Sequence, residues 1–147
     1  MQNFDEKAIA WAERVAIPFA RFSIFLVYFY FGAIKVFAIS GAANPLVIAL
    51  LNKTLSGIDA APFLVAFGVF EMVLGLIFII PHLQRLGLFL LALHIFVIIL
   101  PLFILPNYTW QGFLVPTLEG QYIIKNILII AVGIFILARL RPLNQNV

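Results

Sequence analysis

Four long apolar runs dominate the chain, and short polar or proline-containing stretches separate them. Each run has about the ~20 residues that a helix needs to cross the hydrocarbon core of a bilayer. We therefore expect four transmembrane helices, at residues 18–38, 61–80, 83–105 and 121–140. Pro18 suits the first turn of the first helix, and Pro81 and Pro142 end the second and fourth. Pro101 lies inside the third run and is expected to kink it or to end it early.

Two shorter segments have a different pattern. Residues 3–16 place apolar side chains on one helical face and charged ones elsewhere, which is typical of a helix lying on a membrane. A short helix is also expected in the first long loop, where Asn44 and Pro45 form a start signal and Gly57 a stop signal. It is too short to span a bilayer. We expect it, together with the loop at residues 107–120, to cover the outer ends of the long helices.

The composition agrees with a chain that lies mainly in lipid. Hydrophobic residues make up 65% of the 147, charged residues only 10%, and the mean hydropathy is +1.16. A soluble domain of this length would need far more polar surface. The chain has no cysteine, which excludes disulfides and metal sites with cysteine ligands. The net charge of +3 is too small to indicate nucleic-acid binding, and we expect none.

These patterns predict an all-α fold, an integral membrane four-helix bundle. We expect an N-terminal interfacial helix at residues 1–17, the four-helix domain at 18–140 and a cytoplasmic tail at 141–147. With four spans both termini lie on one side, and that side would carry six of the nine lysines and arginines. The excess of cations favours the cytoplasm for both termini, in a multi-pass protein of the inner (plasma) membrane.

Four ionisable side chains fall inside the expected spans: Lys35, Glu71, His94 and Lys125. Such groups are costly in hydrocarbon and usually face the interior of a bundle. We expect Lys125 to be buried and to face Glu71, with Lys35 nearby. Arg21 lies close to the inner edge, where it is expected to reach lipid phosphates. A structural ion pair and a ligand or proton site explain this pattern equally well.

Helical periodicity places further residues beside these groups. Tyr28 shares a stripe with Lys35 on the first helix, and Tyr122 lies one turn from Asn126 on the fourth. The candidate ligand or proton site therefore comprises Tyr28, Lys35, Glu71, His94, Tyr122, Lys125 and Asn126. The small residues that share these faces suit close helix packing, and they are Gly32, Gly68 and Gly75.

Several other chemistries are disfavoured. A bis-histidine haem needs two histidines at depth, but His82 lies in a turn at the edge of the bilayer, so we expect no haem. No Glu-x-x-His or His-x-x-x-His pair is present for a di-iron or zinc site. No phosphate loop or nucleophile elbow occurs either. We assign no catalytic or metal-binding residue and expect a non-catalytic subunit more readily than a stand-alone enzyme.

Three motifs resemble the DoxX-like family of small four-helix membrane proteins. The first is an arginine followed by Gly-x-x-Lys, at Arg21 and residues 32–35, and the second is Glu-x-x-x-Gly at residues 71–75. The third, Gly120 with residues 125–126, is similar to a Gly-x-x-x-x-Lys-Asp pattern. Loop sequences at residues 44–47 and 109–116 resemble the branch of the family linked to reactive-chlorine resistance. The resemblance covers residues 18–140, but Asn126 replaces the usual aspartate, so a Lys–Asp pair does not carry over.

The resemblance implies four transmembrane helices with inward-facing polar groups and an association with membrane redox systems. It implies an accessory subunit of a quinone-linked or oxidative-stress complex, with a quinone-like or other small apolar ligand in the outer half of the bundle. The residues themselves specify no cofactor, and a quinone is the candidate. Partners would be the lipid bilayer and other membrane-protein subunits or a second copy of the chain. Two alternatives remain open: a purely structural or assembly subunit, and a small transporter or proton conduit.

Overall fold

The computed structural model of the chain describes residues 2–37 and 45–142. Four helical stretches are long and apolar enough to cross a membrane, as the apolar runs predicted. They are Phe4–Val36, Ala60–Ile79, Pro81–Ile104 and Leu118–Ala138. The chain is therefore an all-α, multi-span helical bundle in which apolar side chains face both the core and the surrounding lipid.

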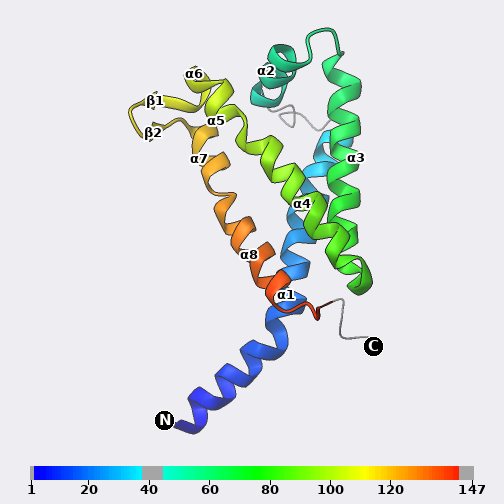
Figure 1. The fold of residues 1–147 in the computed structure, drawn as a ribbon, viewed down its shortest axis with the longest axis vertical. Helices are drawn as coiled ribbons and strands as arrows, with labels where there is room; N and C mark the ends of the chain where they lie inside the picture. Colours follow the sequence, from blue (N-terminus) through cyan, green and yellow to red (C-terminus); the bar gives the residue numbers. More distant parts are fainter. Residues whose placement is uncertain (1, 38–44, 143–147) are drawn as a thin grey trace.

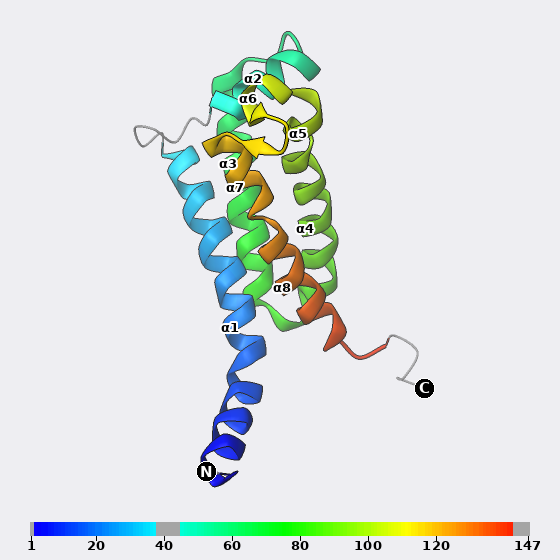
Figure 2. The same cartoon turned by 90° about the vertical axis from the view of Figure 1, so that its left-hand side faces the viewer.

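The four spans form a ring in the order α1, α3, α4 and α8 (Figures 1 and 2). Helix α1 (Gln2–Val36) packs along α3 (Ala60–Ile79) in the most extensive contact of the described fold. Helix α4 (Gln84–Ile99) lies against α3, and α8 (Ile127–Ala138) lies against α4 and α1. The core that they enclose consists of Ala20, Ile24, Tyr28, Leu74, Phe78, Leu91, Ile95 and Ile136.

The N-terminal segment is part of α1 and not a separate helix. Pro18 lies inside α1, which continues from Gln2 to Val36, so the prediction that a new helix begins at Pro18 is wrong. Proline removes one backbone donor and crowds the preceding turn, which bends a helix without always ending it. Figure 1 shows α1 changing direction as its first part leaves the bundle.

Short elements gather at one end of the bundle, which we call the loop end. Helix α2 (Pro45–Thr54) packs there through an apolar cluster of Leu46, Leu105 and Ile123, as the expected loop helix should. The predicted start signal at Asn44 lies outside the described residues. Helix α4 ends at Ile99, close to Pro101, where the sequence predicted a kink or an early end, and a 3₁₀ turn η1 (Pro81–Leu83) precedes α4. The short helices α5 (Pro101–Ile104) and α6 (Pro106–Thr109) follow.

A small hairpin connects α6 to the fourth span. Strand β1 (Trp110–Gly112) pairs antiparallel with β2 (Val115–Pro116), where the sequence predicted only a loop. Alternation is hardly visible in strands of three and two residues, so the pattern along the chain gave no strand signal.

The fourth span is interrupted near its middle. Helix α7 (Leu118–Ile124) ends just before Lys125, and α8 begins at Ile127. The side-chain amide of Asn126 donates to the carbonyl oxygens of Tyr122 and Ile123, at 3.2 Å each. Asparagine competes in this way for backbone partners and tightens the local turn.

Candidate functional site

The close contact between α1 and α3 depends on two glycines that face each other. A Cβ on Gly32 would lie 2.5 Å from the carbonyl oxygen of Gly68, and a Cβ on Gly68 would lie 2.7 Å from that of Gly32. A Cβ on Gly75 would lie 3.0 Å from the carbonyl oxygen of Phe25. Only hydrogen fits at the first two positions, so the two backbones approach as they do at small-residue interfaces in membranes.

Beside this contact, Lys35 and Glu71 form an ion pair. Helices α1 and α3 run antiparallel, so Lys35 and Glu71, each three residues after a glycine, lie about one turn on opposite sides of the glycine contact. Helical side chains point toward the N-terminus of their own helix, so both side chains extend back toward the contact and meet there. The lysine Nζ lies 2.6 Å from Oε2 of Glu71, and the two side chains are only 12% and 7% exposed. Nζ also donates to the carbonyl oxygen of Phe31 at 3.4 Å. Such burial makes the pairing important, because removing one partner leaves a buried charge.

His94 brings the third helix, α4, into the same cluster. Its Nε2 lies 3.3 Å from Oε1 of Glu71, and its Nδ1 lies 3.2 Å from the hydroxyl of Tyr28. The first contact is close enough for electrostatic attraction but lacks hydrogen-bond geometry, so Nε2 is buried without a hydrogen-bond partner among the described residues. Lys35, Glu71, His94 and Tyr28 thus form a continuous row, which we call the polar row.

Aromatic rings enclose the polar row. Phe67 stacks on the imidazole of His94 with centroids 5.2 Å apart and planes at 19°, and Phe70 lies 5.8 Å from it. The Lys35 Nζ lies 5.7 Å from the centre of the Phe67 ring. Neither phenylalanine was among the predicted site residues, although Phe67 precedes Glu71 by one helical turn. These rings exclude water, which strengthens the charge interactions inside the cluster.

The polar row extends only part of the way through the bundle. Lys35 lies next to the end of α1 at the loop end, and Tyr28 lies about two turns further in. Beyond Tyr28 the core consists of Ile24, Leu74 and Phe78, all buried. The described core therefore has a polar half near the loop end and an apolar half near the chain termini.

Arg21 has a different role from the one expected. Its Nε donates to the carbonyl oxygen of Phe78 at 2.8 Å, and Nη2 donates to that of Ile79 at 2.5 Å. The side-chain amide of Gln84 can form hydrogen bonds through both its oxygen and its nitrogen only in one of its two orientations. In that orientation its oxygen accepts from the guanidinium of Arg21. Arg21 therefore caps the last carbonyls of α3, whose negative end favours a cation, and does not extend to lipid phosphates.

Lys125 does not join the polar row. It is exposed, and its Nζ lies 5.2 Å from the ring centre of Tyr122, which is 61% exposed. The expectation that Lys125 is buried against Glu71 is wrong. The reason is the order of the ring, since α3 packs on α1 and α4 while the fourth span lies diagonally across from it. Tyr122 and Asn126 are also apart from the row, and a ligand-binding role for these three residues stays a prediction.

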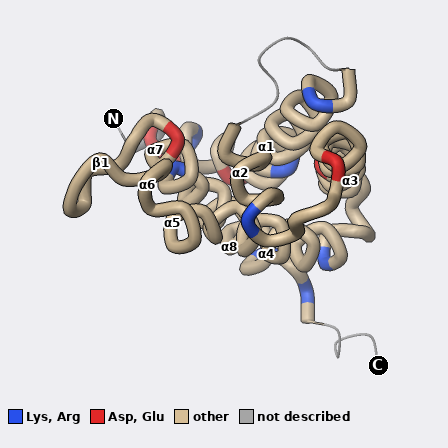
Figure 3. The backbone as a smooth tube through the Cα atoms, turned by 90° about the horizontal axis from the view of Figure 1, so that it is seen from above, with Lys and Arg blue, Asp and Glu red and all other residues tan. Residues whose placement is uncertain are grey.

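Charges are sparse across the rest of the fold. Viewed from the loop end, lysines, arginines and acidic residues lie scattered over the helices (Figure 3). Within residues 2–37 and 45–142, no three His, Asp or Glu side chains gather in a way that would hold a metal ion.

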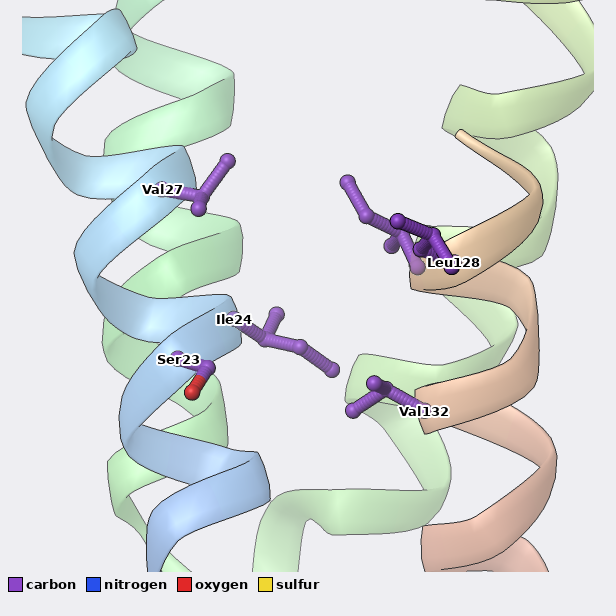
Figure 4. A pocket seen from close by; sticks show the side chains of 6 residues that line it. Ser23, Ile24, Val27, Leu128 and Val132 are labelled. Carbon is purple, nitrogen blue, oxygen red and sulfur yellow. The ribbon is translucent and has the colours of Figure 1, made fainter. Parts of the chain in front are cut away.

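An apolar groove separates α1 from α8 on one side of the bundle. Figure 4 shows Ile24 and Val27 facing Leu128 and Val132 across it. The hollow has a volume of about 100 Å³, and Ser23 and Ile129 complete its lining. Ile24 precedes Tyr28 by one turn, so the groove borders the inner end of the polar row.

Comparisons with protein-family models, with curated proteins and with solved structures found no match.

Proposed function

We propose that this chain is a DoxX-like accessory subunit of a membrane redox or oxidative-stress complex, and that its polar row binds a small neutral ligand. The observation that supports ligand binding is the buried Nε2 of His94, which lacks a hydrogen-bond partner although Glu71 and Lys35 are close. Buried polar atoms are nearly always satisfied, so an orphaned one in an aromatic enclosure suits a site that a ligand completes.

The chemistry of the polar row favours a flat apolar ligand with carbonyl oxygens, such as a quinone. A protonated lysine has three donors, and Lys35 uses two of them, on Glu71 and Phe31. The remaining donor and the imidazole of His94 can both serve a carbonyl acceptor. The rings of Phe67 and Phe70 offer apolar faces to the body of such a ligand.

The apolar half of the core argues against the alternative of a proton conduit. Conduction across the bilayer needs polar groups or water along the whole path. Between Tyr28 and the Arg21 cap the described core offers Ile24, Leu74 and Phe78 instead. A purely structural subunit remains the rival, because the Lys35–Glu71 pair would then serve only to hold α1 on α3.

The proposed location is the inner membrane, with both termini in the cytoplasm and the loop end outside. Six of the nine lysines and arginines lie on the side of the termini under this topology. Reporter fusions at Val147 and at Ser56 check it. We expect activity of a periplasmic reporter only at Ser56, and such activity at Val147 would reverse the topology.

Ligand extraction separates binding from a structural role. We would purify the full chain in mild detergent and identify co-purifying lipophilic molecules and proteins by mass spectrometry. His94→Phe replaces the imidazole by a ring without polar atoms, and His82→Phe makes the same change at an exposed turn residue. We expect a bound ligand in the wild type and in His82→Phe, and its loss in His94→Phe. Equal ligand content in all three, or none in any, would favour the structural subunit.

A further inference from the structure

The β1–β2 hairpin projects sideways from the loop end. Figures 1 and 3 show it reaching past α7, away from the axis of the bundle. The third span ends at Ile104 and the fourth begins at Leu118. Both strands of the hairpin are therefore only a few residues along the chain from the end of a span. It therefore lies to the side of the helices and not over the core that they enclose.

The base of the hairpin is firmly attached to the bundle. The indole Nε1 of Trp110 donates to the carbonyl oxygen of Leu102 at 3.0 Å, and the hydroxyl of Thr117 donates to that of Tyr108 at 2.8 Å. The fully buried Thr109 donates its hydroxyl to the carbonyl oxygen of Leu105 at 3.1 Å. These bonds fix the direction in which the hairpin projects.

The tip of the hairpin is apolar and exposed. Phe113 is 93% exposed and Leu114 is 72% exposed. Leu114 has a φ of 57°, which a glycine adopts freely but which costs a leucine roughly 1–2 kcal/mol. An exposed leucine in a strained backbone conformation contributes little to folding, and such an outlier points to a role outside the fold.

We propose that Phe113 and Leu114 insert into the boundary between headgroups and acyl chains of the leaflet at the loop end. No Asp, Glu, Lys, Arg or His occurs from residue 95 to residue 118, so the hairpin offers no charge for a charged protein surface. Tyr108 and Trp110 stand at its base, and these residue types favour the headgroup level. The hairpin thus anchors the loop end sideways in the lipid, independently of any ligand in the polar row.

Spin labelling tests the insertion directly, because the chain has no native cysteine. Phe113→Cys carries the label at the tip, and Ser56→Cys carries the same label in the exposed turn between α2 and α3, the far point of the loop end (Figure 1). Full-length protein would be placed, one copy per disc, in nanodiscs of phosphatidylcholine and phosphatidylglycerol. Collision rates with oxygen, which enters lipid, and with a polar nickel chelate, which does not, report the depth of each label.

We expect the logarithm of the oxygen-to-nickel collision ratio to be positive for the Phe113 label and negative for the Ser56 label. A negative value at both positions would overturn the proposal. So would a Phe113 label that is open to nickel in the discs and becomes protected only in native membranes, because the tip would then bind a partner protein. The Phe113→Cys variant lacks one of the two side chains that are proposed to insert, so the measurement is repeated with Leu114→Cys, which keeps Phe113. A negative value of the logarithm at Leu114 also contradicts insertion.

Discussion

Lys35 at the end of α1 and Glu71 in α3 meet at 2.6 Å across an antiparallel helix pair, one turn on either side of two glycines that touch at the interface, because both side chains point back toward that contact. The close backbone contact and the ion pair therefore belong to one interface. Glu71 is then shared, since its other oxygen faces His94 at 3.3 Å.

The two partners of this ion pair should respond differently to substitution. Lys35→Met leaves Glu71 buried with His94 as its remaining partner, and we expect a loss of about 3–5 kcal/mol in unfolding free energy. Glu71→Gln should cost less, about 1–3 kcal/mol, because Lys35 lies next to the helix end and can turn outward. Thermal unfolding in mild detergent gives both values.

The double variant of Lys35→Met and Glu71→Gln provides the control for coupling. We expect it to be more stable than Lys35→Met alone, because no buried charge is left over. Lys7→Met, at an exposed position in the first part of α1, should change stability little. Losses that simply add in the double variant would show that the two side chains do not interact.

The glycine contact predicts a second set of losses. Gly32→Ala and Gly68→Ala each place a methyl group against the backbone of the facing helix, and we expect each to cost on the order of 1–3 kcal/mol. Gly112→Ala is the matched control, since nothing lies within 4 Å of its Cβ position. If Gly68→Ala unfolds at the wild-type temperature while the protein stays helical, α1 and α3 do not pack as described.

Much of the fold follows from the sequence for a simple physical reason. A bilayer requires apolar runs of a fixed length, so the number of spans and the short helix at Pro45–Thr54 are visible in the pattern. The pattern does not show where a proline is tolerated. Pro18 gave a start signal, yet the apolar and charged residues around it continue as one helix.

Arg21 shows a tertiary role that the sequence did not reveal. Because its guanidinium bonds the carbonyls of Phe78 and Ile79, we expect Arg21→Met to leave the end of α3 unsatisfied. The loss should be about 1–2 kcal/mol, because the guanidinium makes two charge-assisted hydrogen bonds, of which one is part-buried and the other exposed. Arg14→Met, in the exposed first part of α1, makes the same change without these bonds and serves as the control. Equal unfolding temperatures for the two variants would contradict the cap.

The site was only half predictable because helical periodicity gives the face of each helix but not the neighbour of that face. Tyr28, Lys35, Glu71 and His94 come together because α1, α3 and α4 are neighbours in the ring. Lys125 shares their chemistry, but its helix lies across the diagonal from α3. The order of helices around a ring depends on side-chain packing that a single sequence does not display.

Lys125 therefore gives the sharpest test of the ring order. Lys125→Met should cost less than about 1 kcal/mol, the value of an exposed cation–π contact such as the one with Tyr122. Lys35→Met is the same substitution at the buried lysine and should cost several times more. Adding Glu71→Gln to Lys125→Met should then give only the sum of the two single losses, because distant sites act independently. If Lys125→Met is as harmful as Lys35→Met and Glu71→Gln rescues it, Lys125 faces Glu71 after all, and the diagonal arrangement of α3 and the fourth span is wrong.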